Sequence, residues 1–507
     1  MIRPTDERPD SARGDCIVLG AIAAAIVVLH TLTNGRYGIH RDELQVLDDA
    51  RHLAWGFVPY PPFTPFVERV SLVLFGTSLA WLRFFSAASQ GAVIFTSGWM
   101  ARELDGGRLA QVVAALAVTV APLVMFEGTE FQYSSFDYLW CVLIAWCTIR
   151  LLKSGNPRWW LGIGALIGLG MMTKYTMVFF AFGVAGAALL TPARRHLKSS
   201  WLWCGVGAAI VVFLPNLIWQ IRHQFVAIDF LHHIHTRDVA EGRTRGFLRD
   251  QFLVSTNPFT APLWIAGLLH YFFRREGKLY RMLGWMYLIP FALYLLSKGR
   301  GYYLGPAYPA LFAAGAVWGE RWVASLRPVW SRVVRGGTFA AIAAGGAAAV
   351  ALVIPILPVG SPKNIAIKAN EDLREEIGWK ELVAEVACIR DSLSPAERTH
   401  FAILATNYGE AGAMNFYGPG YGLPPAISGV NSIWQRGYGD PAPETLIVLG
   451  LSRAFVDRHF RGCRIAGHEA NRYGIRNEET REHADIFVCG PPLEPWPEFW
   501  KDFRYFG

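Results

Sequence analysis

Long apolar runs fill the first 360 or so residues of the chain, and they restrict its fold more than any other feature. Their positions are 16–33, 79–101, 108–126, 136–152, 159–173, 175–190, 201–221, 259–273, 280–296, 303–319 and 338–358. A helix needs about 20 residues to cross the hydrocarbon core of a bilayer, and several runs are close to that length. The sequence therefore predicts an all-α polytopic membrane protein with about 11 transmembrane helices. The weakest point is the pair 159–173 and 175–190, which Lys174 separates: it is either a tight hairpin of short spans or one broken helix.

The composition agrees with lipid as the solvent for much of the chain. Only 17% of the residues are charged, against about a quarter in soluble domains, and 19 Trp and 32 Phe are typical of membrane–water interfaces. The net charge of +8 is the excess expected from basic cytoplasmic loops. Because no nucleic-acid-binding motif accompanies this charge, we expect a membrane partner and no nucleic acid.

Basic residues recur at every second loop and predict the orientation. Arg3, Arg8 and Arg13 precede the first run, which is too long for a cleavable signal sequence and is interpreted as a retained span. The positive-inside rule then places residues 1–15 in the cytoplasm. After an odd number of spans, residues 359–507 lie outside, which corresponds to the periplasm of the inner membrane.

Two of the predicted outer loops are basic, against the usual bias. The loop at 34–64 contains Arg36, Arg41 and Arg51, and the loop at 222–258 begins at Arg222 and contains four further arginines. Topology does not explain these cations. An anionic head group is the natural partner for them.

The first outer loop, 34–78, is the most informative stretch. Apolar residues at helical spacing after Arg41 predict an amphipathic interfacial helix, which the proline-rich segment ending at Pro62 terminates. Phe63 to Phe75 predicts a second interfacial helix. Asp42 has two interpretations on spacing alone: it caps the first helix, or it serves as a general base toward an incoming hydroxyl.

A set of motifs favours the second interpretation of Asp42. They are His40–Arg41–Asp42–Glu43, Gly56–Phe57–Val58–Pro59–Tyr60–Pro61–Pro62–Phe63, Ala101–Arg102–Glu103–Leu104, Gly168–Leu169–Gly170–Met171–Met172–Thr173–Lys174–Tyr175, Leu214–Pro215–Asn216 and Tyr302–Tyr303–Leu304. Together they resemble the bacterial dolichyl-phosphate-mannose protein mannosyltransferase-like proteins, which are family 39 glycosyltransferases of the GT-C fold. The resemblance covers about residues 15–320.

The resemblance implies the reaction and two catalytic residues. The reaction is an inverting transfer of a sugar from a polyprenyl-phosphate donor at the outer face of the membrane. Asp42 matches the family's acidic residue that activates or orients the acceptor, and Glu43 matches the second acidic position. Tyr60, in the proline-rich motif, is expected to contact substrate.

A departing phosphate needs positive charge and hydrogen-bond donors. The candidates are Arg41, Lys174, Arg222, His223, Lys298, Arg300, Tyr302 and Tyr303. The last four lie in a basic, aromatic loop that resembles the family's loop over the lipid phosphate; its alternative is an ordinary connection between spans. Lys174 either serves the site or extends to a nearby interface, because an unpaired charge in mid-membrane costs about 2.5–3.5 kcal/mol.

Carboxylates in the second outer loop leave the metal question open. Asp137 opens the fourth run, so it either caps that helix or faces the substrate and holds sugar hydroxyls. No spacing of Cys or His indicates a metal site. We therefore predict no metal ligands and no firm cofactor, with a divalent cation at the carboxylates as the alternative.

Residues 359–507 have the composition of a soluble domain. Short apolar runs at Phe401–Thr406, Thr445–Gly450 and Ala484–Cys489 and a helical pattern over Leu373–Arg390 predict a small α/β accessory domain. A Cys463–Cys489 disulfide is one option in an oxidising compartment. Gly409 and Gly412 are compatible with a phosphate-cradling turn, although they do not form a complete fingerprint.

The domain prediction is thus a cytoplasmic terminus at 1–15, a transmembrane GT-C domain at 16–358 and a periplasmic domain at 359–507. The predicted acceptor is a lipid, a glycan or a protein of the envelope. Two other functions stay open: a transporter or flippase of lipid-linked sugars, and a scaffold that binds lipid phosphate. A transporter would show inverted repeats and charged or broken helices at the midplane. The sequence shows no internal repeat, and its charged residues cluster in the predicted outer loops instead.

Overall fold

The computed structural model describes residues 9–507, and it divides them into two compact units. The first, here called the membrane unit, comprises residues up to Thr33, Arg83–Trp219 and His235–Ile354. The second, here called the head unit, comprises Asn34–Leu82, Gln220–Ile234 and Pro355–Gly507. The first outer loop therefore belongs to the same unit as the C-terminal α/β fold, whereas the sequence-based boundaries grouped it with the membrane helices.

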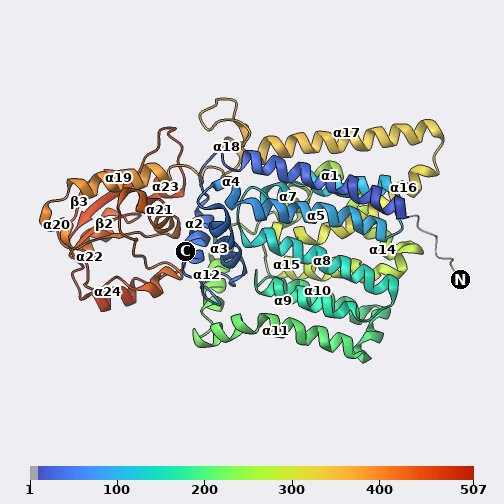
Figure 1. Ribbon diagram of the computed structural model, residues 1–507, viewed down its shortest axis with the longest axis horizontal. Coiled ribbons are helices and arrows are strands. Elements are labelled where there is room, and N and C mark those ends of the chain that lie inside the picture. Colours follow the sequence, from blue (N-terminus) through green and yellow to red (C-terminus); the bar gives the residue numbers. More distant parts are fainter. Residues whose placement is uncertain (1–8) are drawn as a thin grey trace. The chain divides into compact units, whose positions relative to one another are not determined.

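The membrane unit is built of helices whose long members run roughly parallel or antiparallel to one another (Figure 1). Each predicted apolar run contains at least part of a helix. The helices are α1 (Pro9–Thr33), α5 (Phe84–Glu103), α6 (Arg108–Thr119), α7 (Pro122–Glu127), α8 (Tyr133–Ser154), α9 (Trp159–Met171), α10 (Met177–Leu190), α11 (Ser200–Arg222), α13 (Phe247–Leu253), α14 (Ala261–Phe273), α15 (Arg281–Leu296), α16 (Tyr308–Ala324) and α17 (Pro328–Val353). The 3-10 turns Pro192–Lys198, Pro258–Thr260, Glu276–Tyr280 and Gly301–Ala307 connect some of them, and α12 (Val226–Ala240) passes from the head unit into this one.

Length and composition identify fewer spans than the sequence predicted. Within residues 9–507, 5 helices are long and apolar enough to cross a membrane, or up to 7 if two pairs bent by 101° and 82° each count as one span. The helices α9 and α10 have only 13 and 14 residues. The count of about 11 spans remains a prediction. The fold class itself, a polytopic helical membrane protein with a C-terminal α/β unit, is confirmed.

The head unit contains a mixed four-stranded sheet in the order β1-β2-β4-β3. Its strands are β1 (Phe401–Leu404), β2 (Thr445–Val448), β3 (Arg464–His468) and β4 (Asp485–Cys489); only β1 and β2 pair in parallel. The three strands predicted from apolar runs are β1, β2 and β4. The side chains of β3 are largely exposed, so no apolar run indicated this strand.

Helices cover both faces of this sheet (Figure 1). Along β1, Ile403 packs into one apolar cluster with α19 and α21, while Ala402 and Leu404 pack into the other with α22 and α24. The helices of the head unit are α2 (Arg41–Arg51), α3 (Phe63–Phe75), α4 (Leu79–Leu82), α18 (Ile365–Ala369), α19 (Trp379–Ser392), α20 (Pro395–Thr399), α21 (Tyr408–Tyr417), α22 (Arg453–His459), α23 (Glu478–Glu482) and α24 (Trp496–Asp502), with 3-10 turns at Gly418–Tyr421 and Ile433–Arg436.

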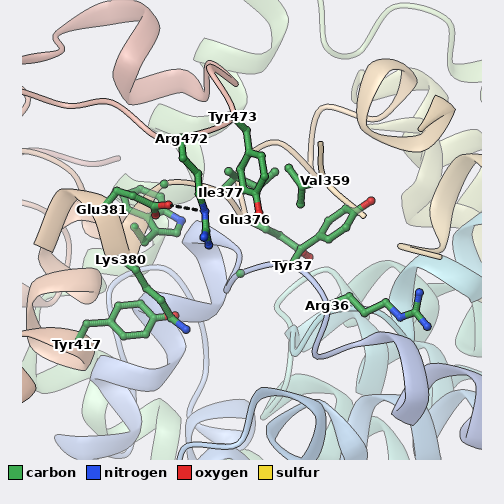
Figure 2. A pocket seen from close by; sticks show the side chains of 13 residues that line it. Arg36, Tyr37, Val359, Glu376, Ile377, Lys380, Glu381, Tyr417, Arg472 and Tyr473 are labelled. Carbon is green, nitrogen blue, oxygen red and sulfur yellow. Dashed lines mark ion pairs between the residues drawn. The ribbon is translucent and has the colours of Figure 1, made fainter. Parts of the chain in front are cut away.

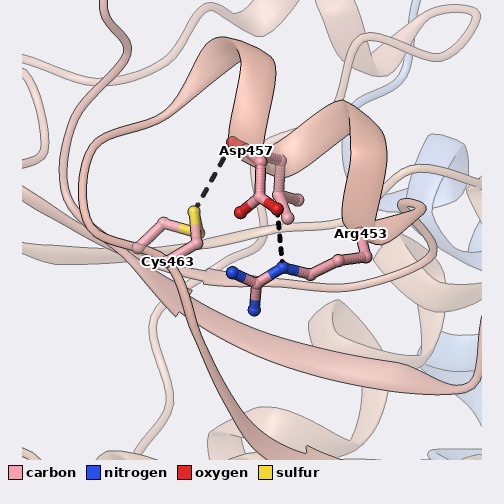
Figure 3. Close-up of a disulfide and its surroundings, with 5 residues drawn as sticks. Arg453, Asp457 and Cys463 are labelled. Carbon is pink, nitrogen blue, oxygen red and sulfur yellow. Dashed lines mark hydrogen bonds and ion pairs between the residues drawn. A yellow bond between two sulfur atoms is a disulfide. The ribbon is translucent and has the colours of Figure 1, made fainter.

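A disulfide joins Cys463, just before β3, to Cys489 at the end of β4 (Figure 3). The sequence left this pairing open, and the structure contains it. The two residues lie in the hairpin-like β3–β4 pair, where their Cα atoms are 4.1 Å apart. Cys388, the third cysteine of the tail, is exposed and unpaired among the described residues.

The helix α3 has the bounds that the sequence predicted. Unlike a surface helix of a soluble protein, it buries polar side chains and exposes apolar ones. Its buried face carries the polar residues Thr64, Glu68 and Ser71. Val73 and Leu74 on the other side are 71% and 61% exposed. An apolar face left open in this way is what an interfacial helix requires.

Candidate active site

The first turn of α2 separates the roles of two neighbouring acidic residues. His40 is the N-cap: its side chain accepts a hydrogen bond from the backbone N–H of Asp42. The Glu43 carboxylate accepts one from the backbone N–H of His40 at 2.8 Å, which completes a capping box. The capping interpretation therefore fits Glu43, a predicted catalytic residue, and does not fit Asp42.

A tyrosine from the C-terminal part of the chain binds the Asp42 side chain. The hydroxyl group of Tyr408, the first residue of α21, donates a hydrogen bond to Asp42 Oδ1 at 2.8 Å. The same hydroxyl accepts hydrogen bonds from Arg41 Nε and Nη2 at 3.0 and 2.9 Å. Arg41, a predicted phosphate ligand, is thus connected to the predicted base through one oxygen atom. This arrangement fixes the orientation of a half-buried carboxylate.

The guanidinium of Arg41 is also paired with carboxylates of α23. It forms ion pairs with Glu478 and, at 3.6 Å, with Glu479. Burial raises the pKa of Glu479 to about 7, with Arg41 opposing the shift, and raises the pKa of nearby Glu375 to about 7 as well. Arg41 is therefore compensated by the head unit itself, and a lipid phosphate would have to compete with these carboxylates.

The rest of α2 differs from the expected interfacial helix. Asp48 and Asp49 are buried, and Arg436 forms ion pairs with both. Tyr60, a predicted substrate contact, is 4% exposed, and its hydroxyl donates a hydrogen bond to Asp49 Oδ2 at 2.8 Å. The expectation that the polar face of this helix meets water is wrong, because Asp48 and Asp49 are buried against Arg436, which lies 387 residues after Asp49 along the chain. The placement of the helix at the membrane surface stays a prediction.

Two glycines of α21 explain how α2 is held. A Cβ atom on Gly412 would lie 2.7 Å from both Cβ and the carbonyl oxygen of Leu44, and one on Gly409 would lie 3.0 Å from Cβ of Arg41. The two helices therefore approach backbone to backbone. The interpretation of these glycines as a phosphate-cradling turn is wrong: they lie within a helix, on the face that contacts α2.

Tyr408→Phe is expected to lower turnover without unfolding the head unit. The substitution removes the donor to Asp42 and the acceptor of Arg41, and one such charge-assisted hydrogen bond corresponds to about tenfold. An unchanged rate would show that Tyr408 only packs. Tyr421→Phe, at an exposed site on the same unit, is the matched control.

The buried carboxyl group of Glu410, in the first turn of α21, should make the stability of the head unit depend on pH. Burial raises its pKa to about 7, although its carboxylate accepts hydrogen bonds from the backbone N–H groups of Thr406 and Asn407. A carboxyl group whose folded pKa is raised stabilises the fold below its unfolded pKa, and this contribution is lost as the pH rises toward 7. Glu410→Gln, which keeps an acceptor, should therefore raise the thermal midpoint at about pH 8 and change it little at about pH 4.

The matched control is Glu397→Gln, in the equivalent position of the capping box of α20. That carboxyl group is only partly buried, and the hydrogen bond that it accepts from the backbone N–H of Ser394 lowers its pKa. Glu397→Gln should therefore not raise the thermal midpoint of unfolding at high pH. Thermal scans at both pH values would decide, and a lower midpoint for Glu410→Gln at high pH would contradict the assignment.

In the membrane unit, Lys174 lies in the break between α9 and α10 and is only 8% exposed. Its ammonium group lies over three aromatic rings, 4.7 Å from the centroid of Tyr303, 5.2 Å from Tyr302 and 5.1 Å from Tyr133. It also interacts electrostatically with Asp137, one helical turn after Tyr133. Four predicted site residues, Lys174, Asp137, Tyr302 and Tyr303, are thus brought together.

The other predicted cations are placed differently. Both oxygens of Asp238 accept hydrogen bonds from Arg300, each at 2.6 Å, so this guanidinium has a bidentate partner. Lys298 is exposed, and so is Arg222 at the end of α11. Arg222 belongs to the head unit, and Lys298 and Arg300 belong to the membrane unit.

Several side chains that contact Arg41, Asp42 and Lys174 were not predicted from the sequence. Tyr408, Glu478 and Glu479 lie in the tail, and nothing in their local sequence connects them with Arg41 and Asp42. Tyr133 had a usable signal, because Tyr133 and Asp137 are spaced four residues apart on one helix and face the same side. Glu127 also interacts with Lys174.

Comparisons with known proteins agree with the resemblance that the sequence motifs indicated. Residues 59–219 match the family model described as dolichyl-phosphate-mannose-protein mannosyltransferase. Two crystal structures of ArnT from Cupriavidus metallidurans, one bound to undecaprenyl phosphate and one in the apo state, align with 94% of this chain and 98% of theirs. Their TM-scores are both 0.57, at 15% and 16% identity. The resemblance to family 39 glycosyltransferases and the GT-C fold that it implied are confirmed.

A curated relative is the lipid A galacturonosyltransferase RgtD of Rhizobium johnstonii. It is 28% identical over 236 residues, which is 44% of this chain and 48% of that protein. This chain therefore matches about half the length of the curated relative.

Proposed function

We propose that this protein transfers a sugar from a polyprenyl-phosphate donor to an envelope acceptor, with inversion at the sugar's anomeric carbon. The observation that carries the proposal is Asp42, in the acidic first loop of a chain with the GT-C fold: its carboxylate is not used as a helix cap and is oriented by Tyr408. The match of residues 59–219 to a mannosyltransferase family supports the reaction class.

In the proposed step, an acceptor hydroxyl attacks the anomeric carbon from the side opposite the phosphate. A new carbon–oxygen bond forms, the bond from that carbon to the phosphate oxygen breaks, and the hydroxyl proton passes to Asp42. Polyprenyl phosphate leaves with the bonding electrons. Lys174 is proposed separately, within the membrane unit, as an anion-binding group, because its ammonium group is buried and lies over tyrosine rings.

We propose the outer face of the inner membrane as the location, with the N-terminus in the cytoplasm and the head unit in the periplasm. The disulfide Cys463–Cys489 supports an oxidising compartment for the head unit. The alternation of basic loops supports the same orientation. We propose a lipid A-type glycolipid as the acceptor, since RgtD is named for such an acceptor.

The test is turnover by the purified chain in nanodiscs. A panel of undecaprenyl-phosphate hexoses, pentoses and hexuronic acids would be offered with lipid A, and the products would be identified by mass spectrometry. A glycosylated lipid A supports the proposal. The absence of product with every donor, together with donor movement between leaflets, would favour the flippase alternative, and donor binding alone would favour the scaffold.

A further inference from the structure

The head unit contains a cleft that the reaction proposed above does not use. Segment 36–38, which follows the first membrane helix, forms one side together with Val359, and the start of α19 and the loop before α23 complete it (Figure 2). Its volume is about 110 Å³. Ligand pockets for drug-sized molecules have roughly 300–1,000 Å³, so this cleft suits one small part of a larger ligand.

The floor of the cleft is rigid. Glu376, Ile377 and Trp379 are each at most 5% exposed. A Cβ atom on Gly38 would lie 1.7 Å from the carbonyl oxygen of Glu376, so only glycine permits this contact between the two walls. The shape of the cleft is thus present before any ligand binds.

Cations and aromatic rings line its rim. Arg472 extends over the ring of Tyr473 at 5.1 Å, and Lys380 lies 5.5 Å from the ring centroid of Tyr417. Arg472 also forms a 3.4 Å ion pair with Glu381, but its side chain is 75% exposed. An ion pair in such a position is weak, so a ligand anion can replace it. Tyr473 is 42% exposed, which leaves much of its surface for a ligand.

Arg472 and Lys380 bring two cations to the cleft, beside the carboxylates of Glu376 and Glu381, whereas the side chain of Arg36 points away from it (Figure 2). Aromatic rings bind the apolar faces of sugar rings, and Arg and Lys bind phosphate and carboxylate groups. The carboxylates of Glu376 and Glu381 can accept hydrogen bonds from hydroxyl groups. One small ligand combines all three requirements: a sugar that carries an anion.

We propose that this cleft binds an anionic saccharide unit, bearing a phosphate or a carboxylate, of the acceptor. The assignment to the acceptor rests on the proposed function; the binding chemistry rests on the cleft alone. Arg472 and Lys380 hold the anion, and Tyr473 contacts the sugar ring. The C-terminal fold is then a recognition element for glycans.

A direct binding measurement tests the proposed site and does not depend on enzymatic turnover. The full chain, in phosphatidylcholine nanodiscs, would be titrated calorimetrically with the bis-phosphorylated glucosamine disaccharide obtained by deacylating lipid A. The double variant Lys380→Ala/Arg472→Ala should weaken binding at least roughly tenfold, the effect expected for a charge-assisted contact. The dephosphorylated disaccharide should bind as weakly to the wild type as the phosphorylated one binds to the variant.

The control is Arg458→Ala/Lys501→Ala, which removes the same charges from exposed positions outside the cleft. It should bind like the wild type. Tyr473→Ala should weaken binding, and Tyr421→Ala should not. Equal affinities of the two double variants, or of the two disaccharides, would overturn the proposal.

A second arm distinguishes the source of the sugar. Nanodiscs that contain lipid A should compete with the soluble disaccharide if the ligand is a membrane head group. Binding of the disaccharide without such competition would overturn the head-group source and leave a soluble glycan. Binding that persists in a preparation without transferase activity would reject the proposed function and retain the site.

Discussion

Asp42→Asn is expected to lower sugar transfer by about 10²- to 10⁴-fold, the contribution of a general base, and to leave membrane insertion and the thermal midpoint near wild-type values. The amide keeps an oxygen that can accept the hydrogen bond from Tyr408, so the head unit retains its contact with α2. What it loses is the ability to take a proton from the acceptor hydroxyl. Initial rates with saturating donor and acceptor measure the effect.

Asp502→Asn, at an exposed position on α24, removes a carboxylate without touching this network and is the matched control. A fall in rate shared by both variants would indicate damage to the preparation. Turnover of Asp42→Asn at the wild-type rate would reject Asp42 as the base, even if the protein proves to be a transferase.

Gly412→Val has the largest expected effect on stability. Its side chain would enter a space where even Cβ lies 2.7 Å from the backbone oxygen of Leu44, and a backbone atom cannot rotate away. Overpacking of this kind costs up to about 3 kcal/mol. In a domain of this size, the thermal midpoint of the head unit should fall by about 6–12 °C.

Because α2 moves when this contact is forced apart, Gly412→Val should also reduce transfer, although it touches neither Asp42 nor Tyr408. Gly420→Val is the control, since nothing lies within 4 Å of the Cβ position at Gly420. A midpoint unchanged by Gly412→Val would show that the two helices are not held together as described. Differential scanning fluorimetry in detergent measures both variants.

Local sequence patterns were sufficient to predict those elements whose buried residues form a continuous apolar run. The bounds of α3 and the positions of β1, β2 and β4 follow from apolar runs, because a strand buried on both faces is apolar along its length. The strand β3 has no such run. Lys174 was selected as a cation between two apolar runs and Asp137 as a carboxylate that opens another, and the structure brings them together.

Long-range compensation could not be predicted in the same way. The acidic residues of α2 were expected to face water, whereas Arg436 neutralises Asp48 and Asp49 in the interior. Glu43 looked catalytic as half of an acidic pair, and only the geometry of His40 reveals its capping role. In each case the deciding partner has no pattern of its own.

The packing of the first outer loop against the C-terminal part of the head unit also has a consequence for biosynthesis. Arg41 and Tyr408 are separated by 367 residues, so at roughly 5–20 residues per second the ribosome needs about 20–70 s to supply the second after the first. During that interval α2 lacks the helix on which it packs and the arginine that neutralises its carboxylates. A nascent chain released before α21 therefore has its membrane helices but no ordered place for Asp42, and truncation of the tail should have the same result.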